Sequence, residues 1–440
     1  MHYEQALEFL RELTKFGFNL GLGRIEELLA RLGNPHRRLR FFHIGGTNGK
    51  GSVAAMVAAI LQAAGYKVGL FTSPHLHRYT ERIRLNGQEI PEEQVARILT
   101  SMRPLLEDMV KAGCEHPTEF EVSTALAFQY FAQVQADLVV LEVGLGGAID
   151  STNVIPSSLV SVITNVGRDH MDYLGPTLTD IAREKAGIIK EKGVVITGAH
   201  RPEALEVIEE VCRQRQASLY RLGREILFTP VEISLQGGKL DWYGWGKSYS
   251  GLRVALLGRH QLSNAALAVA AIEAARHHHH LEVEERHVRE GLERVVWPGR
   301  LEIVSRRPLV VLDGAHNYDG ALAVKEALER LFSYRRLILV LGMLADKERE
   351  KVVDLLAPLA QTVIVTRPNS YRAGDWESLS LYARRHTSEV RVIENISEAL
   401  ETALGLVGPE DMICATGSLY MIADAREWFL MNKKEDFLVK

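Results

Sequence analysis

The stretch that decides the fold is His43-Ile44-Gly45-Gly46-Thr47-Asn48-Gly49-Lys50-Gly51-Ser52. An apolar run precedes it, and the helix-forming run Val53–Leu61 follows it. A strand, a glycine loop and a helix N-terminus in that order form a phosphate cradle. The glycines let backbone N–H groups point at an anion, and the helix dipole adds partial positive charge there. The sequence therefore predicts a phosphate-binding loop that leads into a helix.

Two side chains of this loop carry charge or a hydroxyl to the phosphates. Lys50 can reach the outer phosphates, and the Ser52 hydroxyl can face a magnesium ion. The usual phosphate loop ends Gly-Lys-Ser/Thr, whereas Gly51 separates Lys50 from Ser52 here. This variant of the loop reduces the number of nucleotide-binding families to which the chain can belong. A glycine turn that joins a strand to a helix and binds nothing is the alternative.

Length and composition point to an ordinary globular protein. The 440 residues are enough for two to three domains, and 46% apolar with 25% charged residues is typical of soluble chains. A net charge of −4 gives no electrostatic reason to expect a nucleic acid or an anionic membrane as partner. We therefore expect small-molecule partners only. The absence of an exposed apolar heptad makes a monomer the default expectation.

The expected location is the cytoplasm. The three cysteines, Cys114, Cys212 and Cys414, are far apart and have no metal-ligand spacing, which fits a reducing compartment. The N-terminal residues lack a basic region followed by an apolar core, so they do not resemble an export signal. No apolar run approaches the roughly 20 residues of a membrane helix.

The first part of the chain alternates apolar strands with helical patterns, which predicts a mainly parallel sheet with helices on both faces. The expected strands are Arg40–Ile44, Val68–Phe71, Leu138–Glu142, Val160–Thr164 and Val194–Thr197. From Ile226 to Leu257 the pattern changes to short alternating runs around glycines, which favours antiparallel hairpins. A helix over Asn264–Arg276 follows.

A second alternating series follows Trp297-Pro298-Gly299-Arg300 and predicts a smaller, doubly wound, Rossmann-like domain. Its expected strands are Leu309–Leu312, Leu337–Leu341, Thr362–Thr366, Val390–Ile393 and Met412–Thr416. We therefore expect an α/β protein with two domains, 1–296 and 297–440, joined by a linker at Pro298-Gly299. Such a linker lets one domain swing against the other.

Polar residues follow several of the expected strands, where ligands bind in open α/β sheets. Ser73 follows the second strand, and Arg82 lies shortly beyond it. Glu142 ends the third strand beside the phosphate loop, which is the usual place for a second magnesium ligand. His170 follows the fourth strand. A carboxylate at a strand end and a histidine in a loop each also occur without a function. The occurrence of Ser73, Glu142 and His170 together at neighbouring strand ends favours a functional site.

Lys185 belongs to the helical segment Ile181–Ile189, bracketed by apolar residues and Gly187. This setting predicts a close-packed helix end and a partly buried amine. Burial disfavours the ammonium form and lowers its pKa. A neutral amine can react with carbon dioxide to give a carbamate, which is an anionic ligand for a metal. Carbamylation of Lys185 is therefore a prediction.

With these residues placed, the chain resembles the folylpolyglutamate synthase/dihydrofolate synthase family, the folate branch of the Mur ligase superfamily. The motifs that carry the resemblance run in family order over nearly the whole chain. They are Gly46–Ser52, Thr72–Leu76 with Glu81–Ile83, Leu141–Gly147, Asp169-His170, Arg183–Ile189, Gly258–Gln261 with Asn264–Ala266, Trp297–Glu302, Asp313–Asn317, Gly342–Lys347 and Thr416–Ser418. The loop Gly49–Ser52 together with the Ser73-Pro74-His75 segment points to the folate branch rather than the cell-wall branch.

The resemblance implies a role for each site residue. The ATP site comprises Thr47, Asn48, Gly49, Lys50, Gly51, Ser52, Asn264, Arg300 and Asp313, with His316 as a further candidate. A first magnesium ion is held by Ser73 and Glu142, and a second by His170 with Glu142 and carbamylated Lys185. The catalytic candidates are Lys50, His170, Lys185 and His316. The folate-side candidates are Arg82, Asp150, Thr152 and Asn153.

The reaction implied by the resemblance is ATP- and Mg²⁺-dependent amide formation through an acyl phosphate. L-glutamate is joined to a folate and, in dual-activity members, also to dihydropteroate. A single-activity folylpolyglutamate synthase shares these motifs and stays an alternative, as does a cell-wall amino-acid ligase. From other classes, a phosphate-loop phosphotransferase or NTPase and a catalytically silent nucleotide-binding protein remain as rivals.

Three positions depart from the family pattern. Ala148 stands where arginine is frequent, Arg168 where an apolar residue is commoner, and Tyr318 where proline is usual. None belongs to the phosphate loop or to the expected metal ligands. The first two flank the expected substrate cleft and leave the preferred pteridine substrate open.

Overall fold

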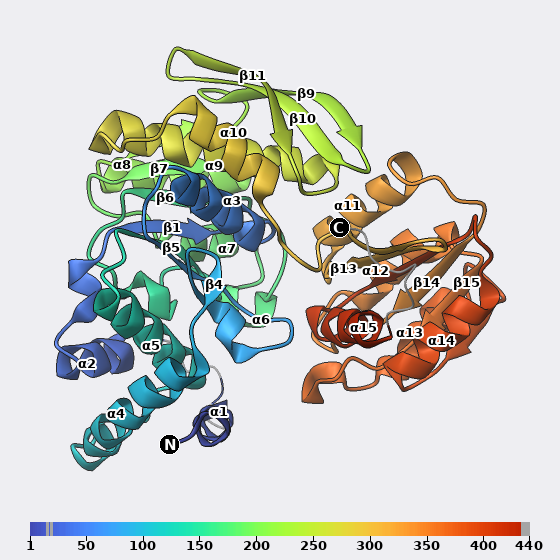
Figure 1. Cartoon of the computed structure of the whole chain (residues 1–440), viewed down its shortest axis with the longest axis horizontal. Helices are drawn as coiled ribbons and strands as arrows, with labels where there is room; N and C mark the ends of the chain where they lie inside the picture. Colours follow the sequence, from blue (N-terminus) through green and yellow to red (C-terminus); the bar gives the residue numbers. More distant parts are fainter. Residues whose placement is uncertain (15–16, 18–20, 433–440) are drawn as a thin grey trace.

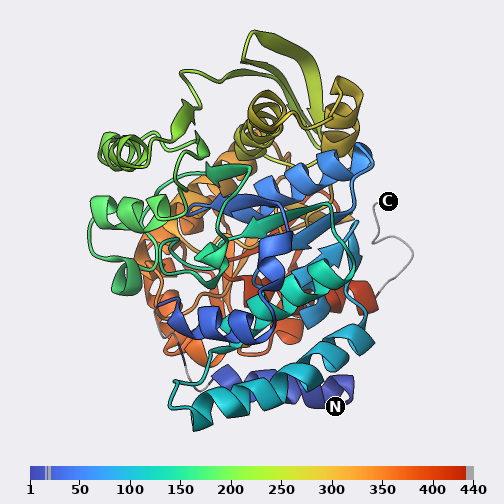
Figure 2. The ribbon, with the colours of Figure 1, turned by 90° about the vertical axis from the view of Figure 1, so that its left-hand side faces the viewer.

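The computed structural model describes residues 1–14, 17 and 21–432. Two helix-covered sheets lie side by side, with a small third sheet beside the first (Figure 1). The view turned by 90° shows the N-terminal helices below the first sheet and the antiparallel strands above it (Figure 2). The expected α/β architecture is confirmed.

The first sheet has eight strands in the order β4-β3-β2-β5-β1-β6-β7-β8. Their bounds are β1 Phe41–Gly45, β2 Val68–Phe71, β3 Ile83–Leu85, β4 Gln88–Glu89, β5 Leu138–Glu142, β6 Val160–Ile163, β7 Val194–Thr197 and β8 Ser218–Arg221. The run from β2 to β8 is parallel, while β3 and β4 pair antiparallel at one edge. The central strands are buried on both faces because helices cover each side.

The helices of this half divide between the two faces of the sheet. One face packs on α3 (Lys50–Ala63) and α9 (Arg259–His279), with α10 (Glu285–Arg294) against α3. The other face carries α1 (Tyr3–Leu13), α2 (Gly23–Arg31), α4 (Glu92–Lys111) and α5 (Glu119–Gln133). The helices α6 (Met171–Leu174), α7 (Leu178–Ala186) and α8 (Pro202–Gln214) pack near β6 and β7. Because α3 is covered on several sides, almost its whole length is apolar.

The expected hairpins form a three-stranded antiparallel sheet of β9 (Leu227–Ser234), β10 (Gly237–Gly244) and β11 (Lys247–Val254). The helix that follows is longer than expected. It begins after Gly258, whose φ of 101° suits glycine, and it ends where His280 turns left-handed at φ 52°. Only the apolar centre of this helix is visible as a pattern in the sequence.

The second large sheet has the order β12-β13-β17-β14-β15-β16. Its strands are β12 Glu302–Arg306, β13 Leu309–Asp313, β14 Leu337–Leu341, β15 Thr362–Val365, β16 Val390–Val392 and β17 Met412–Thr416. Helices cover both faces: α11 Tyr318–Arg330, α12 Arg349–Leu356, α13 Leu379–Ala383, α14 Ile396–Leu406 and α15 Leu419–Met431. All strand pairs are parallel except that of β12 with β13.

Short edge strands are the elements that sequence reasoning missed. β3, β4, β8 and β12 all lie at or near a sheet edge. Strands of two to five residues with one exposed side carry little apolar periodicity, so their pairing depends on the neighbouring strand. Within the residues that the structure describes, no helix is long and apolar enough to cross a membrane.

Candidate functional site

A cavity of about 260 Å³ lies between the two large sheets. It lies at the carboxyl ends of the strands, as expected for an open α/β sheet. All the residues predicted for ATP binding line it, namely Thr47, Asn48, Gly49, Lys50, Gly51, Ser52, Asn264, Arg300 and Asp313. So do Ser73, Glu142, His170, Lys185 and His316. The structure therefore brings the predicted nucleotide, metal and catalytic residues together.

The phosphate loop is held in one conformation by its glycines and by neighbouring loops. Gly49 caps α3 with φ 82°, and a Cβ there would lie 2.5 Å from Oδ1 of Asn264. The backbone N–H of Asn48 donates to Oδ1 of Asn165 at 2.8 Å. The Lys50 ammonium donates to the carbonyl of Thr47 at 3.0 Å, so it points back over the loop. Burial lowers the pKa of Lys50, and the nearby Glu142 carboxylate opposes that shift.

Ser73 and Glu142 meet at the ends of β2 and β5. The backbone N–H of Ser73 donates to Oε2 of Glu142 at 3.2 Å. Glu142 is 5% exposed, and burial raises its pKa to about 7, although the Lys50 ammonium favours the charged form. One hydroxyl and one carboxylate beside a phosphate loop form the partial ligand set that Mg²⁺ uses when phosphates and water complete its shell.

Lys185 is buried, as its surroundings in the sequence predicted. Its ammonium donates to the carbonyl of Gly46 at 3.0 Å, and its residue exposure is 4%. Burial lowers its pKa to about 7, and the Lys50 charge acts in the same direction. The close packing at the helix end has a direct cause, because a Cβ on Gly187 would lie 2.4 Å from Cα of Ala148.

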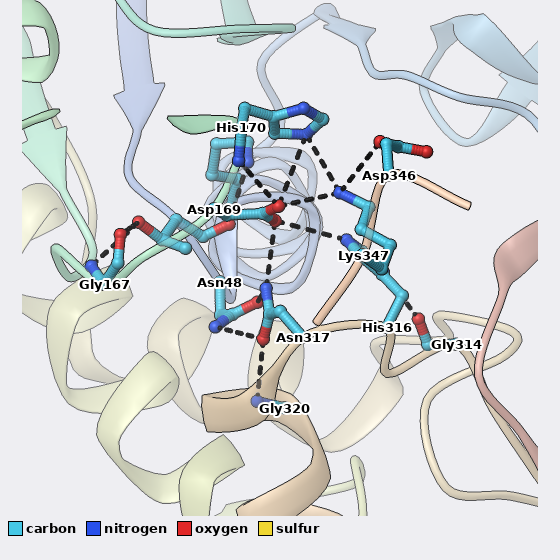
Figure 3. Close-up of polar contacts among 12 residues, drawn as sticks. Asn48, Gly167, Asp169, His170, Gly314, His316, Asn317, Gly320, Asp346 and Lys347 are labelled. Atoms are coloured by element: carbon cyan, nitrogen blue, oxygen red, sulfur yellow. Dashed lines mark hydrogen bonds and ion pairs between the residues drawn. The ribbon is translucent and has the colours of Figure 1, made fainter. Parts of the chain in front are cut away.

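A hydrogen-bonded cluster centred on Asp169 joins the two halves of the protein (Figure 3). Lys347, which follows β14, donates to Oδ1 of Asp169 at 2.7 Å. Asn317 donates to Oδ2 at 3.0 Å, and Nε2 of His316 lies 3.5 Å from the same oxygen. Burial alone would raise the pKa of Asp169, but the hydrogen bond from His316 and the Lys347 charge hold it well below its usual range.

His170 lies beside this cluster. Its Nε2 is 3.5 Å from the Lys347 ammonium, and burial lowers its pKa to about 4 although Asp169 opposes the shift. The ring is therefore neutral at neutral pH, the form in which an imidazole binds a metal.

The phosphate loop itself also contacts the second half of the protein. Asn48 and Asn317 exchange amide hydrogen bonds of 3.2 and 3.0 Å. Figure 3 shows this pair next to Asp169, at the start of α11. The position of the second sheet is thus coupled directly to the phosphate loop.

A second cavity, of about 360 Å³, adjoins the first. Its wall includes two of the predicted substrate residues, Arg82 and Asp150. The residues shared by both cavities are Ser73, Pro74, Gly144, Leu145, His170, His316 and Leu419. The two cavities therefore meet at these residues.

Arg82 and Asp150 are both held by neighbours on the wall. Arg82 donates to Nδ1 of His75 at 2.9 Å and to a carboxylate oxygen of Glu119 at 3.1 Å. Asp150 accepts the backbone N–H of Leu145 at 2.8 Å on its Oδ2. Both side chains are therefore held in one orientation at the wall of the cavity.

The two remaining substrate candidates, Thr152 and Asn153, stand behind the wall rather than on it. Thr152 has no exposed surface and hydrogen-bonds to Asp150 and to His43. The Asn153 amide bonds to the carbonyls of Ala148 and Gly187. The short η4 turn (Ser151–Val154) directs both side chains into the protein, so neither lines the second cavity, and their contact with substrate stays a prediction.

Sequence reasoning quoted Asp169, Asn317 and Lys347 within motifs but assigned them no role. The strand-end position of each was the available signal. Which of them meet, however, depends on how the two sheets face each other. Of the departures from the family pattern, Ala148 fills the space against Gly187, Arg168 is exposed, and Tyr318 begins α11 with 39% exposure.

Two long segments of the chain match Mur ligase domains. Residues 44–272 match the Mur ligase middle domain, and residues 299–419 match the glutamate ligase domain of Mur ligases. The first contains the phosphate loop, and the second contains the loops after β13 and β14, which contribute His316 to both cavities and Leu344 and Lys347 to the second. The chain therefore belongs to the Mur ligase family, ATP-dependent ligases that form amide bonds.

Its relatives come from the folate branch of that family. The dihydrofolate synthase/folylpolyglutamate synthase of Bacillus subtilis is 37% identical over 426 residues, covering 97% of this chain and 98% of that protein. The folylpolyglutamate synthase of Mycobacterium tuberculosis, complexed with ADP and AMPPCP, superposes with a TM-score of 0.90 at 36% identity, covering 98% of this chain and 99% of that one. The E. coli FolC complex with DHPP and ADP has a TM-score of 0.87 at 32% identity, with 98% of both chains covered.

Proposed function

We propose that this protein is an ATP- and Mg²⁺-dependent ligase that adds L-glutamate to a reduced folate to make folylpolyglutamates. It also joins glutamate to dihydropteroate to make dihydrofolate. The observation that carries the proposal is the meeting of two cavities at Ser73, His170 and His316, one lined by the phosphate loop and the other by Arg82 and Asp150. The Bacillus subtilis relative is named for both activities, and the E. coli FolC structure is a complex with DHPP and ADP; both support the proposal.

The first half of the reaction activates the acid. A carboxylate is a poor electrophile, so one of its oxygens attacks the γ-phosphorus of ATP, ADP leaves, and an acyl phosphate forms. The protein contributes mainly position and positive charge. We assign the phosphates to the loop Thr47–Ser52 with Lys50 on the outer ones, and the rest of the nucleotide to Asn264, Arg300 and Asp313.

In the second half the glutamate amine attacks the acyl carbon and inorganic phosphate leaves. The amine loses a proton in this step, and the two catalytic candidates His170 and His316 stand at the junction of the cavities. Water would hydrolyse the acyl phosphate, so the cavity has to be closed during turnover. We propose that 1–296 and 297–440 are the two domains that close, with Pro298-Gly299 as the linker. A stiffened linker with undiminished turnover would argue against this motion.

Magnesium fits the residues present. We propose that Ser73 and Glu142 hold one ion and that His170 with Glu142 and carbamylated Lys185 serves a second. Bound there, magnesium neutralises phosphate charge and polarises the phosphoryl oxygens. The near-neutral pKa of buried Lys185 favours the free amine that carbon dioxide needs. Mass spectrometry of the native protein with and without bicarbonate tests this: a gain of one CO₂ that Lys185→Arg abolishes supports the modification.

The substrates proposed are small molecules only: ATP, L-glutamate and a folate or dihydropteroate. A cytoplasmic location and a monomer complete the proposal. A single-activity folylpolyglutamate synthase is the alternative. A cell-wall amino-acid ligase is the more distant one, since the relatives are named for folate activities.

The decisive experiment compares two acceptors with pure protein, Mg²⁺-ATP and labelled glutamate. One reaction contains dihydropteroate and the other a reduced folate monoglutamate. Incorporation into both supports the dual activity, whereas incorporation into the folate alone supports the alternative. ATP hydrolysis without incorporation into either overturns the folate assignment. The Lys50→Ala variant, assayed in parallel, controls for contaminating enzymes.

A further inference from the structure

One polar side chain stands in the middle of the apolar core of the first domain. His43 lies on β1, the strand between β5 and β6, and has no exposed surface. Its neighbours Phe41, Phe42 and Ile44 are all buried and apolar. A position that served packing alone would carry an apolar residue.

His43 is the inner end of a hydrogen-bond chain that leads to the wall of the second cavity. Its Nε2 lies 2.9 Å from Oγ1 of Thr152. That hydroxyl donates to Oδ1 of Asp150 at 2.5 Å, and the backbone N–H of Thr152 donates to the same oxygen at 2.9 Å. Because the one hydroxyl proton of Thr152 goes to Asp150, the hydroxyl must accept the Nε2–H of His43.

The proton of His43 is therefore placed without ambiguity. Burial lowers its pKa well below the usual value, so the ring is neutral and carries its proton on Nε2. Its Nδ1 is buried and has no hydrogen-bond partner among the described residues. A buried acceptor without a partner is unfavourable, so the histidine is a poor solution for stability alone.

We propose that His43 is a positioning residue for substrate binding: through the Thr152 hydroxyl it holds the Asp150 carboxylate at one orientation on the wall of the second cavity. Asp150 Oδ1 is held by Thr152 and its Oδ2 by the Leu145 backbone, and the residue lines the cavity. A carboxylate fixed on both oxygens offers its remaining lone pairs to an N–H donor of the substrate in a set direction. The inference rests on the proposed folate substrates.

The contribution should appear in acceptor binding rather than in chemistry. Asp150 lines only the second cavity, whereas the phosphate loop lines the first. Loosening Asp150 should therefore weaken the pteridine substrate and spare ATP. This separates a positioning role from a general loss of structure, which would affect all substrates together.

The test uses the variants His43→Leu and Thr152→Val. Each new side chain is similar in volume to the one it replaces, and each removes one hydrogen-bonding group from the His43–Thr152–Asp150 chain. We expect the KM for dihydropteroate and the Kd for a folate, measured by titration, to rise about tenfold, the effect of one buried hydrogen bond. The kcat and the KM for ATP should change less than about twofold by the same reasoning. Thr152→Ser keeps the hydroxyl and should restore acceptor binding.

His36→Leu is the matched control. His36 is also buried, its Nδ1 also has no partner within the described part of the chain, and it packs beside Phe128 with ring centroids 5.8 Å apart. It should leave acceptor binding unchanged. The double variant His43→Leu/Thr152→Val should raise the acceptor KM no more than either single variant, because both substitutions interrupt the same hydrogen-bond chain.

Unchanged acceptor KM in a folded Thr152→Val protein would overturn the proposal. So would an equal loss for acceptor and ATP, or failure of Thr152→Ser to restore binding. The proposed function fails differently, because the unaltered protein would then incorporate no glutamate with either acceptor.

Discussion

The ion pair between Asp169 and Lys347 offers the sharpest test of how the two domains work together. It joins a loop of the first sheet to a loop of the second, with the Asp169 side chain 10% and the Lys347 side chain 5% exposed. Lys347→Met keeps most of the side-chain volume and removes the charge. Asp169 would then be buried at the contact between the two loops without its cation.

The size of the effect follows from the geometry. At the observed 2.7 Å, two unit charges attract by about 6 kcal/mol at an effective dielectric constant of about 20. Desolvation cancels much of this, and removing one partner of a buried pair typically costs about 3–5 kcal/mol. Asp169 keeps its hydrogen bond from Asn317, so we expect the lower end, about 3 kcal/mol. That is on the order of a hundredfold in the ratio of closed to open protein.

The loss should fall on the arrangement of the domains rather than on the stability of either one, since the two partners belong to different sheets. We expect kcat/KM for the glutamate reaction to fall by up to about a hundredfold. Small-angle scattering of the nucleotide-bound protein should show a larger radius of gyration. Lys351→Met, which removes an exposed ion pair with Glu348 in the same domain, is the control and should have no effect.

Normal turnover in Lys347→Met would refute the reasoning about this pair. A fall in activity that is matched by early unfolding would refute it as well, because the ion pair would then support the fold of one domain and not the contact between them. A Lys347→Arg variant retains the charge at the site and should therefore keep most of the turnover.

Three further predictions concern the nucleotide site and stability. Gly49→Ala should abolish ATP binding in a titration, because a Cβ would collide with Asn264, whereas Gly65→Ala has the same left-handed backbone with nothing within 4 Å and should only lose about 1 kcal/mol of stability. Chelation of divalent cations should stop glutamate incorporation, and Ser73→Ala should raise the Mg²⁺ concentration needed for half-maximal rate; an unaltered requirement would remove Ser73 from the metal site. Burial lowers the pKa of His36 to about 4, so the unfolded state binds more protons than the folded state between that value and about 6.5. Stability should therefore decrease as the pH is lowered through this window, by up to about 1.4 kcal/mol per unit. Denaturant titrations should show a flatter pH profile for His36→Leu, and an equal slope in both proteins would contradict this origin.

The local patterns predicted that these residues come together, because each has a recognisable position along the chain. Gly49 and Lys50 stand between a strand and a helix, and Ser73, Glu142 and His170 each end or follow a buried strand. Parallel strands deliver their carboxyl ends to one edge, so these residues had to converge. Lys185 was predicted to be buried from its apolar neighbours and Gly187, and the structure confirms this with a carbonyl partner at Gly46.

The features that the sequence did not predict share a different cause. Thr152 and Asn153 follow Asp150 directly, yet the η4 turn points them inward, and no pattern in four residues reveals that direction. The strands β3, β4, β8 and β12 were missed because their pairing depends on strands distant in sequence. The partners of Asp169 are 147 to 178 residues away along the chain.

The sequence by itself determined the phosphate loop, the alternation that builds two sheets, and the family to which the chain belongs. These are local or periodic properties, set by glycine conformations, apolar spacing and residue order. Only the tertiary structure decided that Lys347 and Asn317 donate hydrogen bonds to Asp169. It also decided that His43 is linked to Asp150 by hydrogen bonds through Thr152. Such contacts depend on how whole sheets and turns are oriented in space, and that orientation is the sum of all the packing in the core rather than a property of any one segment.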